Sequence, residues 1–224
     1  MGAMSDSSLL DRFTALDSAA VSDALDQLGL SSGVGGIRPQ WSPAAVVGFA
    51  VTVGLEPRTG GHTGAHIATT AVERSDDQSV IVIDNQGRTD VSCWGGILSL
   101  GAVQRGVRGV VADGVCRDVA EARELDFPVF SRGSIPATAR GRLQQHSTGE
   151  PVSIAGLMVE QGDVVVADET GLVVVPRDRA EEVAEIATAI VARERAIADE
   201  VRAGVPLSQT MHDARLAREK ESIR

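Results

Sequence analysis

Segments with apolar residues at helical spacing alternate along this chain with continuous apolar runs. Between residues 7 and 29, apolar residues recur at helical spacing and end at Gly29, which predicts a helix. Further helices are predicted at 61–75, 96–105 and 118–125. Continuous runs rich in Val and Ile predict buried strands between them, at 44–55, 79–84, 108–113 and 127–133.

The second half of the chain changes character. Residues 136–176 contain short strand-like runs separated by Gly-Asp and Thr-Gly turns, and a long helix is predicted at about 178–203. Helices alternating with strands, followed by a run of strands, indicate an α/β fold with mixed sheets and a long C-terminal helix. We expect one domain over residues 5–204 and a polar C-terminal arm over 205–224.

Composition narrows the functional classes. The formal net charge of −10 argues against binding to nucleic acid, which requires cations against the phosphates. No apolar run reaches the roughly 18 residues of a membrane span, and no signal peptide is recognisable before the first helix. The two cysteines do not suggest a disulfide framework, so we expect a cytoplasmic protein with reduced thiols.

Lysine usage limits the mechanism. Of the 21 basic residues only Lys220 is a lysine, and it lies in the polar tail. Schiff-base chemistry requires a lysine in a desolvated pocket. If the protein performs carbonyl chemistry, we therefore expect a metal ion to serve as the electron sink.

The candidate chemistry lies in the run CWGGILSLGAVQRGVRGVVADGVCRD, residues 93–118. Two glycines precede a helix whose first N–H groups can bind an anion. An apolar strand then ends at Arg117 and Asp118, and ligands bind at such strand ends in α/β sheets. An arginine suits a carboxylate, and an aspartate suits Mg²⁺ or Mn²⁺. The run is thus compatible with a site for a small 2-oxo acid and a divalent metal. The alternative is that Asp118 only caps the helix at 118–125.

This combination of motifs resembles the RraA-like family. Besides the run above, ELDFPVFSRG and GDVVVADETGLVVVP carry the resemblance, which extends from about Ala19 to Gly204. The family includes 4-hydroxy-4-methyl-2-oxoglutarate and 4-carboxy-4-hydroxy-2-oxoadipate aldolases and regulators of ribonuclease E. The resemblance implies a layered β/β/α swivelling-domain fold, assembled as a homotrimer or hexamer with active sites between subunits.

The resemblance also implies roles for individual residues. Arg117 matches the arginine that contacts pyruvate, and Asp118 matches the metal-binding aspartate. The backbone at Gly95, Gly96, Ile97 and Leu98 matches the segment that holds the pyruvate carboxylate. The aldolases carry an acidic residue at the position of Gly96, and its absence here raises the question of what replaces it.

Three further groups have two interpretations each. Glu194 interrupts an apolar stripe of the C-terminal helix. It matches a glutamate that the family supplies to a neighbouring subunit's site, and Glu200 is the alternative match. The second interpretation is that Glu194 forms an ion pair with an arginine. His62, for which we expect a substrate contact, and His66 have the i, i+4 spacing of a metal face. Asp113 is either a support for the metal site or a turn former.

The sequence therefore predicts a divalent-metal-dependent lyase acting on a small 2-oxo acid, by retro-aldol release of pyruvate or by decarboxylation of oxaloacetate. Arg117, Asp118 and Glu194 are the predicted catalytic residues, and Asp118 is the predicted metal ligand. The alternative is a protein-binding regulator of the ribonuclease E inhibitor type, without catalytic activity.

Overall fold

The computed structural model describes residues 5–31, 33–41, 45–60 and 64–212. Its helices are α1 Asp6–Thr14, α2 Ser18–Gln27, α3 Thr69–Arg74, α4 Gly96–Gln104, α5 Val119–Glu124, α6 Ala180–Arg202 and α7 Leu207–Thr210, with a 3-10 turn η1 at Arg177–Arg179. Its strands are β1 Arg38–Pro39, β2 Val46–Pro57, β3 Ser79–Ser92, β4 Gly109–Cys116, β5 Val129–Ser134, β6 Leu143–Thr148, β7 Val152–Ile154, β8 Leu157–Val159, β9 Val164–Ala167 and β10 Leu172–Val175.

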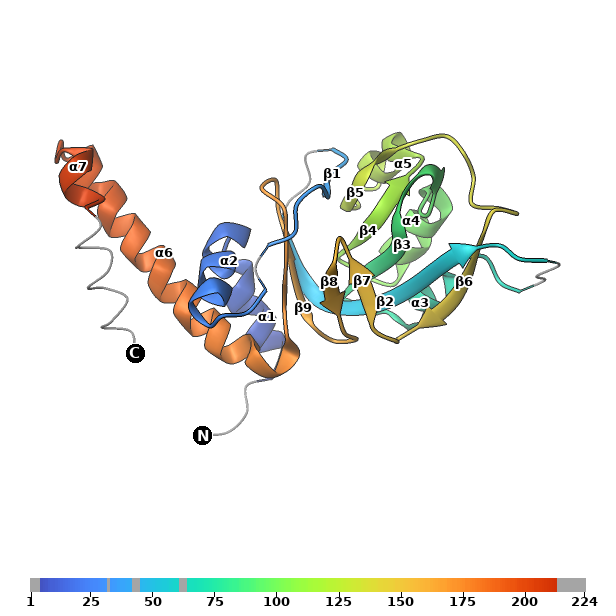
Figure 1. The fold of residues 1–224 in the computed structure, drawn as a ribbon, viewed down its shortest axis with the longest axis horizontal. Coiled ribbons are helices and arrows are strands. Elements are labelled where there is room, and N and C mark those ends of the chain that lie inside the picture. The colour runs from blue at the N-terminus through green and yellow to red at the C-terminus, as the bar shows by residue number, and fades with distance from the viewer. Residues whose placement is uncertain (1–4, 32, 42–44, 61–63, 213–224) are drawn as a thin grey trace.

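One mixed sheet forms the centre of the molecule (Figure 1). Its strand order is β1-β5-β4-β3-β2-β9-β10, with β6 paired to β2 beside this path. The run from β2 through β3 and β4 to β5 is parallel, whereas β1, β6, β9 and β10 pair antiparallel. A bridge between Val34 and Leu172 joins the chain before β1 to β10, so the sheet is nearly closed. The predicted α/β class with mixed sheets is confirmed.

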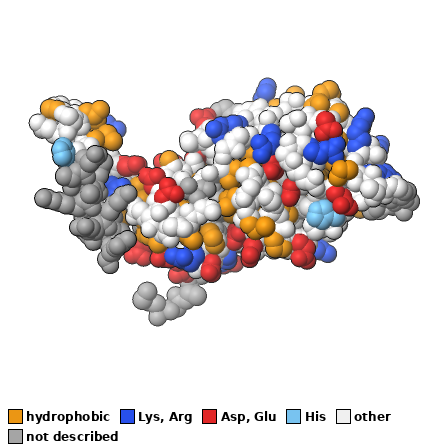
Figure 2. Space-filling view, viewed as in Figure 1, with side chains coloured by type: hydrophobic (Ala, Val, Ile, Leu, Met, Phe, Trp, Pro, Cys, Tyr) orange, Lys and Arg blue, Asp and Glu red, His pale blue; other side chains and the backbone are white. Residues whose placement is uncertain are grey.

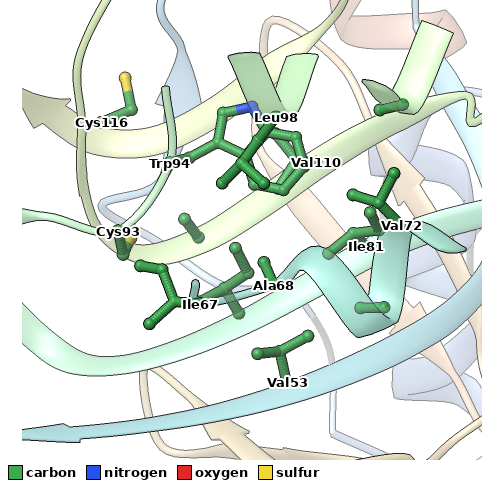
Figure 3. Close-up of a cluster of buried hydrophobic side chains, with 14 of the residues drawn as sticks. Val53, Ile67, Ala68, Val72, Ile81, Cys93, Trp94, Leu98, Val110 and Cys116 are labelled. Atoms are coloured by element: carbon green, nitrogen blue, oxygen red, sulfur yellow. The ribbon is translucent and has the colours of Figure 1, made fainter. Parts of the chain in front are cut away.

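Three apolar cores produce the layers. The β7–β8 hairpin packs Val152, Ile154 and Val159 against the inner face of the curved sheet. On the outer faces, α3, α4 and α5 cover β3 and β4 (Figure 3), and α1, α2 and α6 cover β9 and β10. Because the strands of the sheet are buried on both faces, their sequences are continuously apolar rather than alternating.

The predicted helix at 7–29 is two helices. The chain breaks at Ala15–Asp17, and the Asp17 carboxylate accepts a hydrogen bond from the Ala20 amide (2.8 Å) to start α2. The predicted helix at 61–75 is also shorter, because of its described residues only Thr69–Arg74 are helical. Residues 61–63, including His62, lie outside the described residues.

The strand predicted at 79–84 continues to Ser92. The NQGR segment, whose composition is typical of a turn, lies inside β3. Gln86 (φ 56°) and Gly87 (φ 67°) have positive φ, and the pairing with β4 shifts register between Asp84 and Arg88. A turn-forming sequence has therefore produced an irregularity within the strand rather than its end.

The predicted long C-terminal helix is confirmed, but its second half extends beyond the part of the molecule that contains the sheet. Figure 1 shows α6 running away from the sheet to α7. The buried residues of α6 end at Ile190, and Glu194 is exposed in the single chain. The stripe continues in the sequence beyond the point where the sheet can cover it. No helix in the described residues is long and apolar enough to cross a membrane.

Candidate active site

A cavity of about 330 Å³ opens where β3 and β4 end and α4 begins. Its wall includes Arg117 and Asp118, which directly follow β4, and Gly95 to Leu98 at the start of α4. β3 and β4 are parallel neighbours, and such paired carboxyl ends are the usual ligand sites of α/β sheets. The structure thus brings these predicted site residues together around one cavity, while their roles remain predictions.

Backbone bonds hold the two segments of the site side by side. The Cys93 amide donates to the Val115 carbonyl (2.9 Å), and the Arg117 amide donates to the Trp94 carbonyl (3.0 Å). The Trp94 indole is buried in the apolar cluster of Figure 3, and its Nε1 donates to Ser99 Oγ within α4 (2.9 Å). The start of α4 is therefore fixed against the end of β4.

The Asp118 carboxylate is directed toward α4. Asp118 occupies the N-cap position of α5 but makes no capping bond there, so the capping explanation for the helix at 118–125 is wrong. Instead its Oδ2 accepts from the Gly96 amide (2.9 Å), and both oxygens accept from Arg117 Nε (3.0 and 3.1 Å). With φ 58°, Asp118 adopts the left-handed conformation, which is rare outside glycine and is often retained at functional sites.

The two glycines make room for carboxylates of the chain itself. A Cβ on Gly95 would lie 2.8 Å from Asp118 Oδ2. A Cβ on Gly96 would overlap the Glu121 carboxylate and lie 2.6 Å from its Cδ. Glu121, one turn after Asp118 on α5, was missed in the sequence. Its carboxylate occupies the space that a side chain at position 96 would enter, and position 96 is where the RraA-like aldolases were expected to carry an acidic residue.

The start of α4 retains unpaired donors. The amide of Gly96, predicted to bind the substrate, already donates to Asp118. The amides of Ile97 and Leu98 have no hydrogen-bond partner among the described residues, as is normal in a first helical turn. With the helix dipole behind them, these two donors favour an anion at this end of the cavity.

The residues present fit a hard divalent ion bound mainly by water and substrate. Within the described part of the chain no group of three or more His, Cys, Asp or Glu side chains could hold a metal. Asp118 retains acceptor capacity beyond its bonds to Gly96 and Arg117, and the Glu121 carboxylate lies nearby. Mg²⁺ is commonly held by one or two carboxylates, with water and substrate completing its shell.

The cavity also contains a second polar group of residues. His66, Thr138 and Arg140 line it along with Arg117. Burial, together with the charge of Arg140, lowers the pKa of His66 below its ordinary value of 6.5. Arg140 was also missed in the sequence, because a loop between β5 and β6 brings it to the cavity from beyond the recognisable motif.

The remaining candidates lie elsewhere. Glu194 does not line the cavity of its own chain. Asp113 is buried, pairs with Arg132 and accepts from the Ala155 amide of the β7–β8 turn (2.6 Å), so its role is structural. Burial raises the pKa of both the Cys93 and the Cys116 thiols, which keeps them protonated and disfavours a thiolate nucleophile.

Comparison with known proteins identifies the family. The model of the RraA-like family, described as aldolase/RraA, matches residues 18–174. The chain belongs to the RraA-like family. It is 32% identical, over 87% of its length and 90% of the other, to a protein of Halalkalibacterium halodurans named "Putative 4-hydroxy-4-methyl-2-oxoglutarate aldolase". Protein DlpA of Legionella pneumophila is 34% identical over 92% of this chain, which spans only 33% of DlpA.

Solved RraA-like structures have the same fold. That of Streptomyces coelicolor RraAS2, described as an unusual member of the RNase ES inhibitor RraA protein family, superimposes with a TM-score of 0.78. It is 27% identical to this chain, with 87% of this chain and 98% of RraAS2 covered. The predicted family and layered fold are thus confirmed, and the family holds both proteins named as aldolases and proteins named as inhibitors of RNA processing.

Proposed function

We propose that the protein is a divalent-metal-dependent lyase that cleaves a small 2-oxo acid, by retro-aldol release of pyruvate or by decarboxylation of oxaloacetate. The observation that carries the proposal is the arrangement of Arg117 and Asp118 against the first turn of α4, at the wall of one cavity. A carboxylate with spare acceptors, a guanidinium and unpaired amides are the groups required to bind a metal and a carboxylate side by side.

Each of these groups has a defined task in such a reaction. The Ile97 and Leu98 amides bind the substrate carboxylate, and the Arg117 guanidinium orients it and stabilises the enolate that forms. Asp118 holds the ion, which when bound would polarise the keto oxygen. The Glu121 carboxylate, which has no hydrogen-bond partner among the described residues, is our candidate for accepting the proton of the 4-hydroxyl group during cleavage.

We further propose a homotrimer or hexamer with active sites between subunits. On α4, Ile97 (81% exposed), Leu100 (45%) and Val103 (36%) form an apolar stripe beside the cavity. Figure 2 shows further hydrophobic side chains at the far end of the protruding helix, where Leu207 and Met211 are exposed. Covering these surfaces with neighbouring subunits would also allow Glu194 on α6 to approach another chain's cavity.

The assay is pyruvate release from 4-hydroxy-2-oxo acids and from oxaloacetate, with Mg²⁺, Mn²⁺ or EDTA. We expect turnover that requires the ion and falls at least about 100-fold in Arg117→Ala and Asp118→Ala, since each removes a charged contact in the transition state. Turnover that survives EDTA, or that survives both substitutions, contradicts the assignment. Light scattering of Leu100→Glu, with loss of the trimer expected, tests the assembly.

The alternative is a regulator of the ribonuclease E inhibitor type. Similarity to RraAS2 and the net charge of −10 support it. A regulator would inhibit a ribonuclease equally well with Asp118→Ala as with the unmodified chain, whereas a lyase would lose its activity. Inhibition without metal-dependent pyruvate release would favour this second function.

A further inference from the structure

The two glycines before α4 give the site room but not rigidity. The space beside Gly95 and Gly96 is occupied by the carboxylates of Asp118 and Glu121. Glycine restricts its own backbone less than any other residue, so this pair alone would let the amides that follow it change direction. Those amides can bind an anion in the cavity only while their direction is fixed. Other residues must therefore hold the backbone at the start of α4.

Ser99 holds the helical side of the glycine pair. It lies in the first turn of α4 and is completely buried. Its amide donates to the Gly95 carbonyl (3.0 Å), and its Oγ donates to the same carbonyl (3.2 Å). The same Oγ accepts a hydrogen bond from Trp94 Nε1 (2.9 Å). The Ser99 hydroxyl thus joins the side chain before the glycines to the first carbonyl of the helix.

Trp94 connects this arrangement to the other half of the site. Its carbonyl accepts a hydrogen bond from the Arg117 amide (3.0 Å). Its indole is buried (Figure 3) and stacks on Phe127, with ring centroids 6.0 Å apart and ring planes at 18°. A buried ring held by stacking and by a hydrogen bond has little freedom to rotate. Trp94 therefore fixes Arg117 and the first turn of α4 relative to each other.

We infer that Ser99 is a positioning residue, whose hydroxyl keeps the unpaired amides of α4 in line with Arg117. It acts through the Trp94 indole and the Gly95 carbonyl, because a completely buried side chain touches no ligand itself. The inference rests on the proposed function, in which these amides and Arg117 bind one substrate carboxylate. A displacement of about 1 Å in such a site can reduce the rate about 100-fold.

Ser99→Ala tests the inference, and Ser75→Ala is the matched control. Ser75 is also buried, and its Oγ also donates to the carbonyl four residues earlier, that of Ala71 (2.7 Å), at the end of α3. Both variants should lose thermal stability, since each loses a buried hydroxyl bond. Oxalate, which resembles the pyruvate enolate, is titrated calorimetrically with Mn²⁺ present. It should bind about 10-fold more weakly to Ser99→Ala and with unchanged affinity to Ser75→Ala.

Kinetics and a second variant extend the test. In pyruvate release, Ser99→Ala should raise KM more than it lowers kcat, because the substrate carboxylate is bound before and during the reaction. Trp94→Phe removes the same bond from its other side, so it should also weaken oxalate, and the double variant should bind little more weakly than either single variant.

Four results would overturn the inference: no oxalate binding to the unmodified protein, unchanged affinity in Ser99→Ala, an equal loss in Ser75→Ala, or losses that multiply in the double variant. Pyruvate release that continues in any of these cases would leave the proposed function standing. Oxalate binding that depends on Ser99, in a protein that releases no pyruvate, would overturn the proposed reaction and leave the inference standing.

Discussion

Two aspartates of this protein do the same local job with different consequences. Asp118 and Asp168 each accept a hydrogen bond from the first amide of a distant helix, Gly96 of α4 in one case and Ser18 of α2 in the other. Asp168, in the β9–β10 turn, also accepts from Ser18 Oγ (2.7 Å) and from the amides of Thr170 (2.8 Å) and Gly171 (3.3 Å).

The difference lies in the acceptor capacity that remains. Asp168 is surrounded by four donors that hold a turn against a helix, so its carboxylate is committed to structure. Asp118 has one backbone donor and the guanidinium of its neighbour, and it borders a cavity with two unpaired amides beside it. A carboxylate at a helix terminus thus indicates a binding site only when its own fold leaves it partly unsatisfied.

The largest effect should separate the two aspartates by activity. Asp118→Asn keeps an oxygen for the Gly96 amide but removes the charge, and we expect kcat to fall at least about 100-fold with little change in Tm. Asp168→Asn should keep its turnover. Steady-state kinetics, Mn²⁺ binding and thermal unfolding of both variants provide the comparison. Equal losses of turnover would mean that Asp118 is structural in the same sense as Asp168.

The next effect concerns the space above Gly96. Gly96→Ala would force the Glu121 carboxylate to move, and we expect about a 10-fold or greater loss of turnover, since general acid–base contributions are of this size or larger. Glu121→Gln should cause a similar loss, and the double variant should lose little more. Gly101→Ala is the matched control: its Cβ would meet only Val72 Cγ1 at 3.5 Å, an ordinary contact. If the losses of turnover in Gly96→Ala and Glu121→Gln added up in the double variant, the two substitutions would act independently, and Gly96→Ala would not act by displacing Glu121.

A third effect is on stability and its pH dependence. Burial acts to raise the pKa of Asp168, but the hydrogen bonds from Ser18, Thr170 and Gly171 outweigh it and lower the pKa below its ordinary value of 3.8. The carboxylate therefore stabilises the fold fully above about pH 3.8, and this contribution is lost as the pH falls through the folded-state pKa.

Asp168→Asn should accordingly lower the free energy of unfolding by about 1–2 kcal/mol at pH 7, a value reduced for solvent screening at a half-exposed site. Urea unfolding from pH 7 to pH 3 measures it. The difference in the free energy of unfolding between the unmodified protein and Asp168→Asn should become smaller toward pH 3. A difference that grows toward pH 3 would mean that folding raises the pKa of Asp168 rather than lowering it.

The sequence predicted what depends on neighbours along the chain. Arg117 and Asp118 are adjacent, follow an apolar strand and could be recognised together. The contact of Asp168 with Ser18 spans 150 positions, and Arg140 reaches the cavity through a loop, so neither leaves a local pattern. The exposure of Glu194 in the single chain was not predictable for a related reason: helical periodicity gives the apolar face of α6 but not the residue at which the sheet stops covering it.

The smallest effect tests how Asp168 divides its bonds. Ser18→Ala removes one hydroxyl donor and leaves the Ser18 amide in place, so we expect a loss of about 0.5–1.5 kcal/mol in the free energy of unfolding and unchanged turnover. Ser8→Ala, at an exposed position of α1, should change it by less than about 0.5 kcal/mol. Equilibrium unfolding at pH 7 compares the two variants.

If Ser18→Ala lowered the free energy of unfolding as much as Asp168→Asn does, the hydroxyl would carry the whole contact and the four-donor description of this aspartate would be wrong. An intermediate value supports a carboxylate whose acceptor capacity is taken up by four donors, whereas Asp118, with the Gly96 amide and Arg117 as its donors, keeps part of its capacity free.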